Sequence, residues 1–355
     1  MTTVVDPVDW DLARRVAVRF SGQEPLADSY LADSLRTDFA EFTPVAEQLV
    51  GAETGLVSLL GPARARVISR EEWIAANIAS FQRLLRPLMD KLAEKMGSGA
   101  MSGVTRRFAA LELGAVLGWM SRRVLGQYDL LVIEEESPLD QDLVYFVGPN
   151  VLAVEKRFAF PPREFRLWLA LHELTHRAQF TGVPWLRPYF LDQIETLIAD
   201  VEPDSQRLID GLRRLRSARR DGSPSEGGIS LLLSSPEQQE TLSRLTGLMS
   251  LLEGHGDVTM SRAGAGLVPS AGRFGRVLQA RRRQQTGLNR IVQRLLGLEA
   301  KLAQYEQGER FIEVVEAERG RNGIDPVWVS ADNLPTMPEI KEPDLWLQRV
   351  AAVAA

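Results

Sequence analysis

Two of the three histidines in this 355-residue chain stand four residues apart, in the sequence His172-Glu173-Leu174-Thr175-His176. On a helix with about 3.6 residues per turn, His172 and His176 lie on the same side, so both imidazoles can bind one metal ion. Glu173 is turned about 100° away from His172, and we expect it to hold a metal-bound water and to take its proton as a general base. This pattern predicts the chemistry of a zinc-dependent hydrolase.

The residues around the motif predict the helix that it needs. From Phe165 to Phe180 there is no glycine or proline. Pro161-Pro162 open the segment, where proline is tolerated because its missing N–H has no helical partner. Apolar residues recur at helical spacing along one face, namely Leu167, Leu171, Leu174 and Ala178. The alternative is an ordinary helix that carries two surface histidines.

A catalytic zinc site takes three protein ligands and keeps a fourth position open for water. The chain has no cysteine, so the third ligand must be His, Asp or Glu. We expect a second long helix from Ser235 to Met260, with Glu253 on its apolar stripe. A carboxylate there is costly unless a charged partner, such as a metal ion, accompanies it. Glu253 is therefore the preferred third ligand, and Gly254 beside it would let another backbone or a substrate come close.

His255 is the competing candidate for the third ligand. It lies two residues from Glu253 and points to nearly the opposite side of a regular helix. If Glu253 binds the metal, His255 either stabilises the oxyanion of the transition state or is a helix-end histidine without a role. Asp257, one turn after Glu253, would accept the free N–H of a ligating imidazole. The alternative for Glu253 and Asp257 is a salt-bridged surface pair.

A His-Glu-x-x-His helix followed by a ligand glutamate on a later helix resembles the gluzincin peptidases, although their ligand glutamate commonly follows the motif more closely than Glu253 follows His176. The chain is also similar, from end to end, to an uncharacterised bacterial family of zincin-like hydrolases. That resemblance implies a zincin-like metal site and a mostly helical fold, but no particular substrate. The similar stretches are Asp9–Ala13, Val124–Asp129, Val147–Asn150, Phe165–Trp168, Gln179-Phe180, Pro184–Arg187 and Leu252–Gly256.

The rest of the chain predicts a mainly α fold with a small β-sheet. The predicted helices are Asp9 to Phe20, Ala27 to Leu60 with breaks at Pro44 and Gly51, Arg70 to Lys95 kinked or divided at Pro87, Arg106 to Leu125, and Asp344 to Val353. Ala110, Gly114, Gly118 and Arg122 form a mostly small-residue line suited to close helix packing. Gly97 to Gly103 and Asp221 to Gly228 are predicted to be linkers, and Gly323 to Glu342 an irregular segment.

Two strands are expected immediately before the motif, Tyr128 to Glu134 and Leu143 to Val147, with a turn-rich segment between them. In zincins an edge strand in this position pairs with the extended substrate. The resemblance therefore implies that a peptide pairs with Leu143 to Val147. The alternative is a plain structural hairpin.

The segment from Val258 to Leu298 contains eight arginines and no acidic residue, although the net charge of the whole chain is only −5. These arginines, at 262, 273, 276, 281, 282, 283, 290 and 294, either form a basic wall that favours an acidic substrate or a solvated face that pairs with an acidic helix such as Glu309 to Glu318. A single aromatic residue, Phe274, stands among these arginines, which is too few for base stacking, so nucleic-acid binding is not expected.

The hydrophobic content of 45% is ordinary for a globular protein. No stretch reaches the roughly 20 apolar residues of a membrane span, and Met1 to Asp11 lack the pattern of a secretory signal, so a cytoplasmic protein is expected. We predict one zincin-like unit over 1–355, or a helical region 1–125, a metal-site core 126–265 and a helical region 266–355. Its expected activity is zinc-dependent hydrolysis of amide bonds in a peptide or small molecule. The alternative is a zincin-shaped binding protein.

Overall fold

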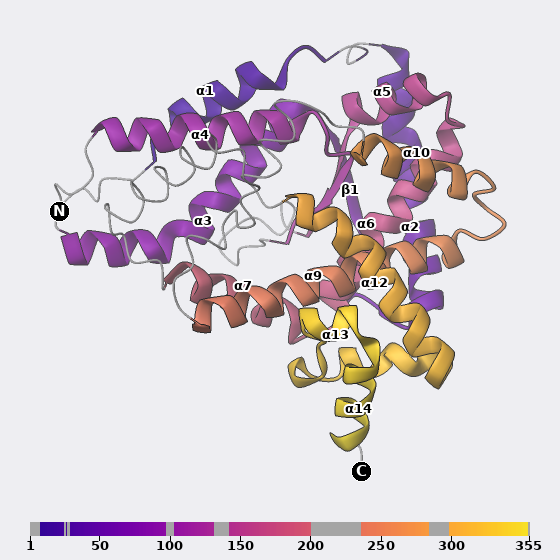
Figure 1. Ribbon diagram of the computed structural model, residues 1–355. Coiled ribbons are helices and arrows are strands. Elements are labelled where there is room, and N and C mark those ends of the chain that lie inside the picture. The colour runs from indigo at the N-terminus through magenta and orange to yellow at the C-terminus, as the bar shows by residue number, and fades with distance from the viewer. Residues whose placement is uncertain are drawn as a thin grey trace. The chain divides into compact units, whose positions relative to one another are not determined.

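The computed structural model describes residues 8–24, 26, 29–96, 103–130, 142–199, 236–283 and 298–353 (Figure 1). These residues are mostly helical, with one three-stranded sheet, as the sequence predicts. The chain divides into two compact units, the first made of Met1–Pro184 and Thr259–Gln279 and the second of Trp185–Val258 and Ala280–Ala355. The predicted linker residues 97–102 and 221–228 lie outside the described residues.

The first unit contains the sheet and the helices around it. Its elements are α1 (Trp10–Ser21), α2 (Tyr30–Thr54), β1 (Arg64–Ile68), α3 (Arg70–Met96), α4 (Gly103–Ser121), β2 (Gly126–Tyr128), β3 (Leu143–Val147), α5 (Gly148–Phe158), α6 (Pro162–Gly182) and most of α10 (Ala271–Arg283). The helices predicted from Asp9, Arg70 and Arg106 are therefore confirmed as α1, α3 and α4, with shifted ends.

Strand β3 lies in the middle of the sheet, whose order is β1-β3-β2. It pairs in parallel with β1 and antiparallel with β2, and Phe146 lies opposite both Val67 and Gly126. The expectation that Leu143–Val147 forms an edge strand open to a peptide is wrong, because both of its hydrogen-bonding edges are occupied. The other predicted strand, Tyr128 to Glu134, overlaps the observed β2 (Gly126–Tyr128) only at Tyr128. Residues 129 and 130 are not in a strand, and residues 131–134 lie outside the described residues.

Helices cover both faces of the sheet, which explains why all five residues of β3 are buried. On one face, Tyr145 belongs to an apolar cluster with Trp73 and Ile74 of α3 and Leu117 of α4. On the other face, the Phe146 ring stacks on Phe39 of α2 with ring centroids 3.7 Å apart. The alternation of side chains along β3 thus places the sheet between two helical layers.

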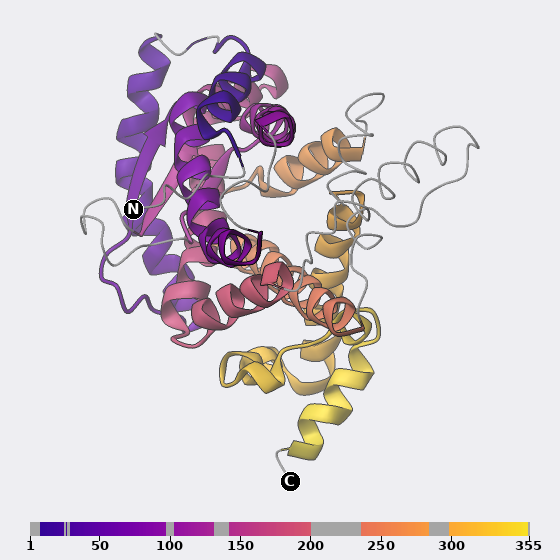
Figure 2. The same ribbon diagram turned by 90° about the vertical axis from the view of Figure 1, so that its left-hand side faces the viewer.

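Helices α1 and α4 lie side by side (Figures 1 and 2). Their backbones approach closely at Gly114 and Gly118, where an added Cβ atom would lie 2.5 Å from the carbonyl oxygens of Ala13 and Ala17 respectively. Any larger residue would force the helices apart. The small-residue line predicted on α4 is therefore a helix-packing face.

Two prolines at which the sequence predicts a break or a kink do not divide their helices. Helix α2 runs through Pro44 and Gly51, and α3 runs through Pro87. A proline inside a helix removes one backbone hydrogen bond. In α2 the loss is offset by burial of residues on both sides of Pro44, including Phe39 and Val50, because tertiary packing supplies most helix stability in proteins.

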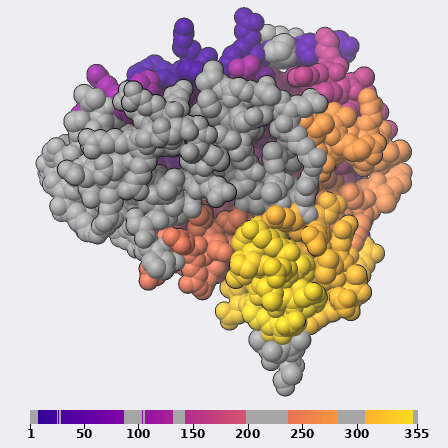
Figure 3. All heavy atoms as spheres, in the orientation of Figure 1, coloured from indigo at the N-terminus to yellow at the C-terminus, as the bar shows by residue number. Residues whose placement is uncertain are grey.

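The second unit is helical in the part of it that the structure describes. Its elements are α7 (Leu186–Ala199), most of α9 (Pro236–Ala263), α12 (Leu298–Arg319), the 3₁₀ segments η2 (Arg321–Trp328) and η3 (Ala331–Asn333), α13 (Met337–Lys341) and α14 (Pro343–Val353). The segment predicted to be irregular thus consists of short helical turns, and the predicted last helix is α14. The yellow C-terminal elements form one packed mass (Figure 3), in which Trp346 is fully buried against Phe311.

Candidate metal centre

The motif histidines lie on α6, the helix that the sequence predicts for them. Their side chains are half-buried, and the Nε2 atoms of His172 and His176 lie 3.2 Å apart. Two nitrogens that each bind one tetrahedral zinc ion at about 2.0–2.1 Å must lie about 3.3 Å from one another. The observed separation therefore suits joint binding of one zinc ion.

Gln179 orients one of these imidazoles. Its side-chain oxygen lies 3.0 Å from Nδ1 of His176 and is fully buried. When Nδ1 carries the proton and donates to this oxygen, the lone pair of His176 is on Nε2, the nitrogen that faces His172. Gln179 belongs to a stretch that carries the family resemblance, but no role for it is predicted from the sequence. Its position three residues after His176 places both side chains on one side of α6.

Glu173, the motif glutamate, lies on α6 next to His172. Its side chain is 7% exposed and lies against the backbone of β2 at Gly126. The carboxylate is thus held between α6 and the sheet rather than in open solvent.

Helix α6 is anchored near its start by a buried charge network. Arg166 donates to both carboxylate oxygens of Glu155 at 2.8 and 2.9 Å and to Asp38 at 2.7 Å. Burial raises the pKa of the Glu155 carboxyl, and the hydrogen bonds and charge of Arg166 oppose that rise without cancelling it. These contacts tie the motif helix to α5 and α2.

A second buried arginine anchors α6 next to the motif. Arg177 is 1% exposed and bonds Asp142 at 2.6 Å, Glu47 at 2.6 Å and the carbonyl oxygen of Gly61 at 2.7 Å. Burial by itself would lower the pKa of Arg177, but the hydrogen bonds and charges of the two carboxylates outweigh it and raise that pKa above its ordinary value. The guanidinium is therefore a fixed cation between α6, β3 and α2.

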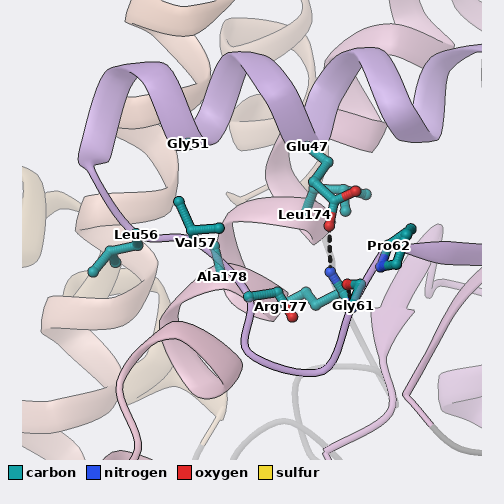
Figure 4. Close-up of a pocket in the computed structure, with 10 residues that line it drawn as sticks. Glu47, Gly51, Leu56, Val57, Gly61, Pro62, Leu174, Arg177 and Ala178 are labelled. Carbon is teal, nitrogen blue, oxygen red and sulfur yellow. Dashed lines mark hydrogen bonds and ion pairs between the residues drawn. The ribbon is translucent and has the colours of Figure 1, made fainter.

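Arg177 also lines a cavity of about 250 Å³ in the first unit. The cavity lies between α2, the loop after it and the side of α6 that carries Leu174 and Ala178, and the ion pair of Glu47 and Arg177 forms part of its wall (Figure 4). Leu174 is turned about 200° from His172 around the helix. The cavity is thus on the opposite side of α6 from the two histidines and is not part of the metal centre.

The predicted second helix is confirmed as α9, which ends three residues later than expected, at Ala263. On it, Glu253 and Asp257 are half-buried and His255 is buried. The His255 ring packs edge-on against Trp328, with centroids 4.9 Å apart. The His255 side chain thus packs on η2.

Gly254 admits a close neighbour, as the sequence analysis expected. An added Cβ atom there would lie 2.2 Å from the carbonyl carbon of Gly308, so this neighbour is the backbone of α12. At the end of α9, Gly264 packs on Leu171, the residue immediately before His172, with 3.1 Å from an added Cβ atom to the leucine side chain. The helix of Glu253 therefore ends against the helix of the motif.

His172, His176 and Glu253 form a group that could hold a metal ion. One ring nitrogen of each histidine and one carboxylate oxygen of Glu253 all lie within 4.8 Å of one another. Two imidazoles and one carboxylate are a donor set that zinc accepts in catalytic sites. His255 is not a member of this group among the residues that the structure describes.

Two arginines of the basic segment contact groups of the first unit. Arg262 lies 4.0 Å from Glu53, and Arg273 donates to the carbonyl oxygens of Phe158 and Ala159. Arg290 and Arg294 lie outside the described residues. Whether the segment is a basic wall for substrate or a paired face stays a prediction.

Residues 8–347 match the sequence model of the zincin-like metallopeptidase family. The chain belongs to this family. The zincin-like resemblance predicted from the sequence is thus confirmed over nearly the whole chain. A crystal structure of a presumed hydrolase with a novel fold, from Chloroflexus aurantiacus, is similar to this zincin-like chain at 34% identity, with a TM-score of 0.72 over 97% of this chain and 99% of that one. The comparison of this chain with curated proteins gave no match.

Proposed function

We propose that this zincin-like protein is a zinc-dependent hydrolase of amide bonds, with His172, His176 and Glu253 as the zinc ligands. The observation that supports the proposal is the convergence of these three donors within 4.8 Å, in a chain that also keeps the motif glutamate Glu173. Three ligands leave a fourth position for water or substrate, as catalytic zinc sites require and structural zinc sites do not. When bound there, zinc would polarise the scissile carbonyl and lower the pKa of a water.

The side chains have separate tasks in this proposal. Glu173 takes the proton of the attacking water on its carboxylate and delivers it to the leaving amine nitrogen as the C–N bond breaks. Gln179 holds His176 with Nε2 available for the metal, and Asp257 is proposed to accept from the other N–H of a ligand imidazole. His255 is proposed to stabilise the oxyanion, from a ring that packs on Trp328.

The proposed substrate is a peptide, with an amide-containing small molecule as the second candidate. The central position of β3 favours the small molecule, because a peptide cannot add to a strand that is hydrogen-bonded on both edges. A zincin-shaped binding protein without activity is the alternative from a different class, and it has no need for a proton acceptor at Glu173.

No helix in the described parts of the chain is both apolar enough and long enough to cross a membrane.

The test is the zinc content and activity of the purified chain beside two variants. Wild-type protein should bind about one zinc ion per chain and cleave members of a mixed set of fluorescence-quenched peptides or acyl-amide substrates. Glu173→Gln should keep the zinc and lose the cleavage, since an amide cannot accept the proton. His172→Ala should lose both. Cleavage that survives in Glu173→Gln, or a wild-type chain that cannot be loaded with zinc, would contradict the proposal.

A further inference from the structure

Strand β2 contains a glycine, Gly126, where the Glu173 side chain packs against its backbone. A Cβ atom added to Gly126 would lie 2.6 Å from Oε1, 2.7 Å from Cγ and 2.8 Å from Cδ of Glu173. Real Cβ atoms essentially never approach other heavy atoms this closely. The glutamate side chain therefore occupies the volume that any side chain at residue 126 would need.

The backbone conformation does not explain the glycine. Gly126 is not among the described residues with a positive φ angle, so an L-residue could adopt its conformation. Glycine is also a poor strand residue, and within a strand it often marks a place where another group approaches the backbone closely. At Gly126 that group is the Glu173 carboxylate and its stem.

Strand β2 cannot move aside to make room. It is hydrogen-bonded to β3, with Gly126 opposite Phe146, and its next residue, Gln127, accepts a 2.7 Å hydrogen bond from Nε1 of the buried Trp73. A side chain at 126 must therefore displace Glu173 rather than the strand. The three heavy atoms nearest to the added Cβ atom all belong to Glu173, so we expect His172 and His176 to stay in place.

We propose that Gly126 is a positioning residue for Glu173: its lack of a side chain lets the glutamate lie flat on β2 and fixes where its carboxylate can be. This inference rests on the proposed role of Glu173 as the proton acceptor. A base displaced by about 1 Å from its reacting proton can cost about 100-fold in rate. Even a methyl group at residue 126 should therefore impair the chemical step while the fold and the zinc site persist.

The test compares Gly126→Ala with Gly275→Ala, a matched glycine of the first unit whose added Cβ atom would meet nothing within 4 Å. With the most readily cleaved peptide of the quenched set, Gly126→Ala should lower kcat about 100-fold, with little change in KM and a normal zinc content. Gly275→Ala should leave all three quantities unchanged. An unchanged kcat in Gly126→Ala would overturn the inference.

A measurement that does not need activity separates this inference from the proposed function. Thermal unfolding is compared for Gly126→Ala, Glu173→Ala and the double variant. If the methyl group competes with Glu173 for one volume, Gly126→Ala should lower the melting temperature in the wild-type background and lower it less, or not at all, when Glu173 is already alanine. Equal effects in both backgrounds would overturn the positioning role. Coupled effects in a protein without hydrolytic activity would leave the positioning intact and refute the proposed function.

Discussion

The side chain that completes the ligand set is the most consequential assignment at the scale of single residues. Glu253 lies with His172 and His176, whereas the His255 ring packs on Trp328. The zinc affinities of three variants should therefore differ in a fixed order. Glu253→Ala should bind zinc most weakly, because it loses a ligand and a compensating charge. Asp257→Ala should bind zinc about 10–100-fold more weakly than wild type, and His255→Ala should have nearly the wild-type affinity. Competition with a chromophoric zinc chelator measures all three. The reverse order would make the site all-histidine and remove the gluzincin-like character.

Residue types and spacing were enough to predict part of the proposed metal centre. The pair His172 and His176 follows from the helix period, and the preference for Glu253 follows from the cost of a carboxylate on an apolar stripe. Gln179 and Gly126 could not be assigned in the same way. Their roles depend on which atom a side chain meets across the fold, and a glutamine or glycine in a sequence carries no sign of that partner.

At the scale of elements, α6 is fixed by what its non-motif side contacts. Arg177 is held between Asp142 at the start of β3 and Glu47 of α2. Arg177→Met should destabilise the protein by about 3–5 kcal/mol, because it leaves a buried carboxylate without its cation. Arg244→Met is the control, since Arg244 pairs with Glu240 on the exposed surface of α9 and such pairs contribute about 0.3–0.5 kcal/mol. Urea unfolding measures the free energy of unfolding of both variants. Equal losses of stability in the two variants would show that the Arg177 network does not anchor α6.

The elements themselves could be predicted better than their arrangement. Helical periodicity predicts α3, α6 and α9, but the order of the strands could not be inferred. The missed strand β1 pairs with β3 between residues nearly eighty positions apart, as Arg64 lies opposite Leu143, and no local pattern encodes such a pairing. Pro44 was misjudged for a related reason: a local rule predicted a break, and burial of α2 against α6 and the sheet overrode it.

At the scale of the whole molecule, the units are not consecutive pieces of chain. The first unit includes Thr259–Gln279, which lies in the sequence between the two parts of the second unit. This segment supplies Phe274, whose buried ring has its centroid 5.2 Å from that of Phe165. A chain cut at Pro184 would therefore leave part of this core uncovered. The predicted division at 125 and 265, and the single unit over 1–355, stay predictions.

Zinc should stabilise the whole chain if the proposed ligands bind it. A ligand that binds only the folded state adds about 2.7 kcal/mol of stability at a free concentration 100 times its dissociation constant. The melting temperature of zinc-loaded protein should therefore exceed that of protein treated with a chelator. His255→Ala should keep this difference, because its ring packs on Trp328, whereas His172→Ala should abolish it. Differential scanning calorimetry with and without zinc gives the comparison. A melting temperature that does not respond to zinc in the wild-type chain would refute the metal centre, and a response that survives in His172→Ala would place the zinc elsewhere.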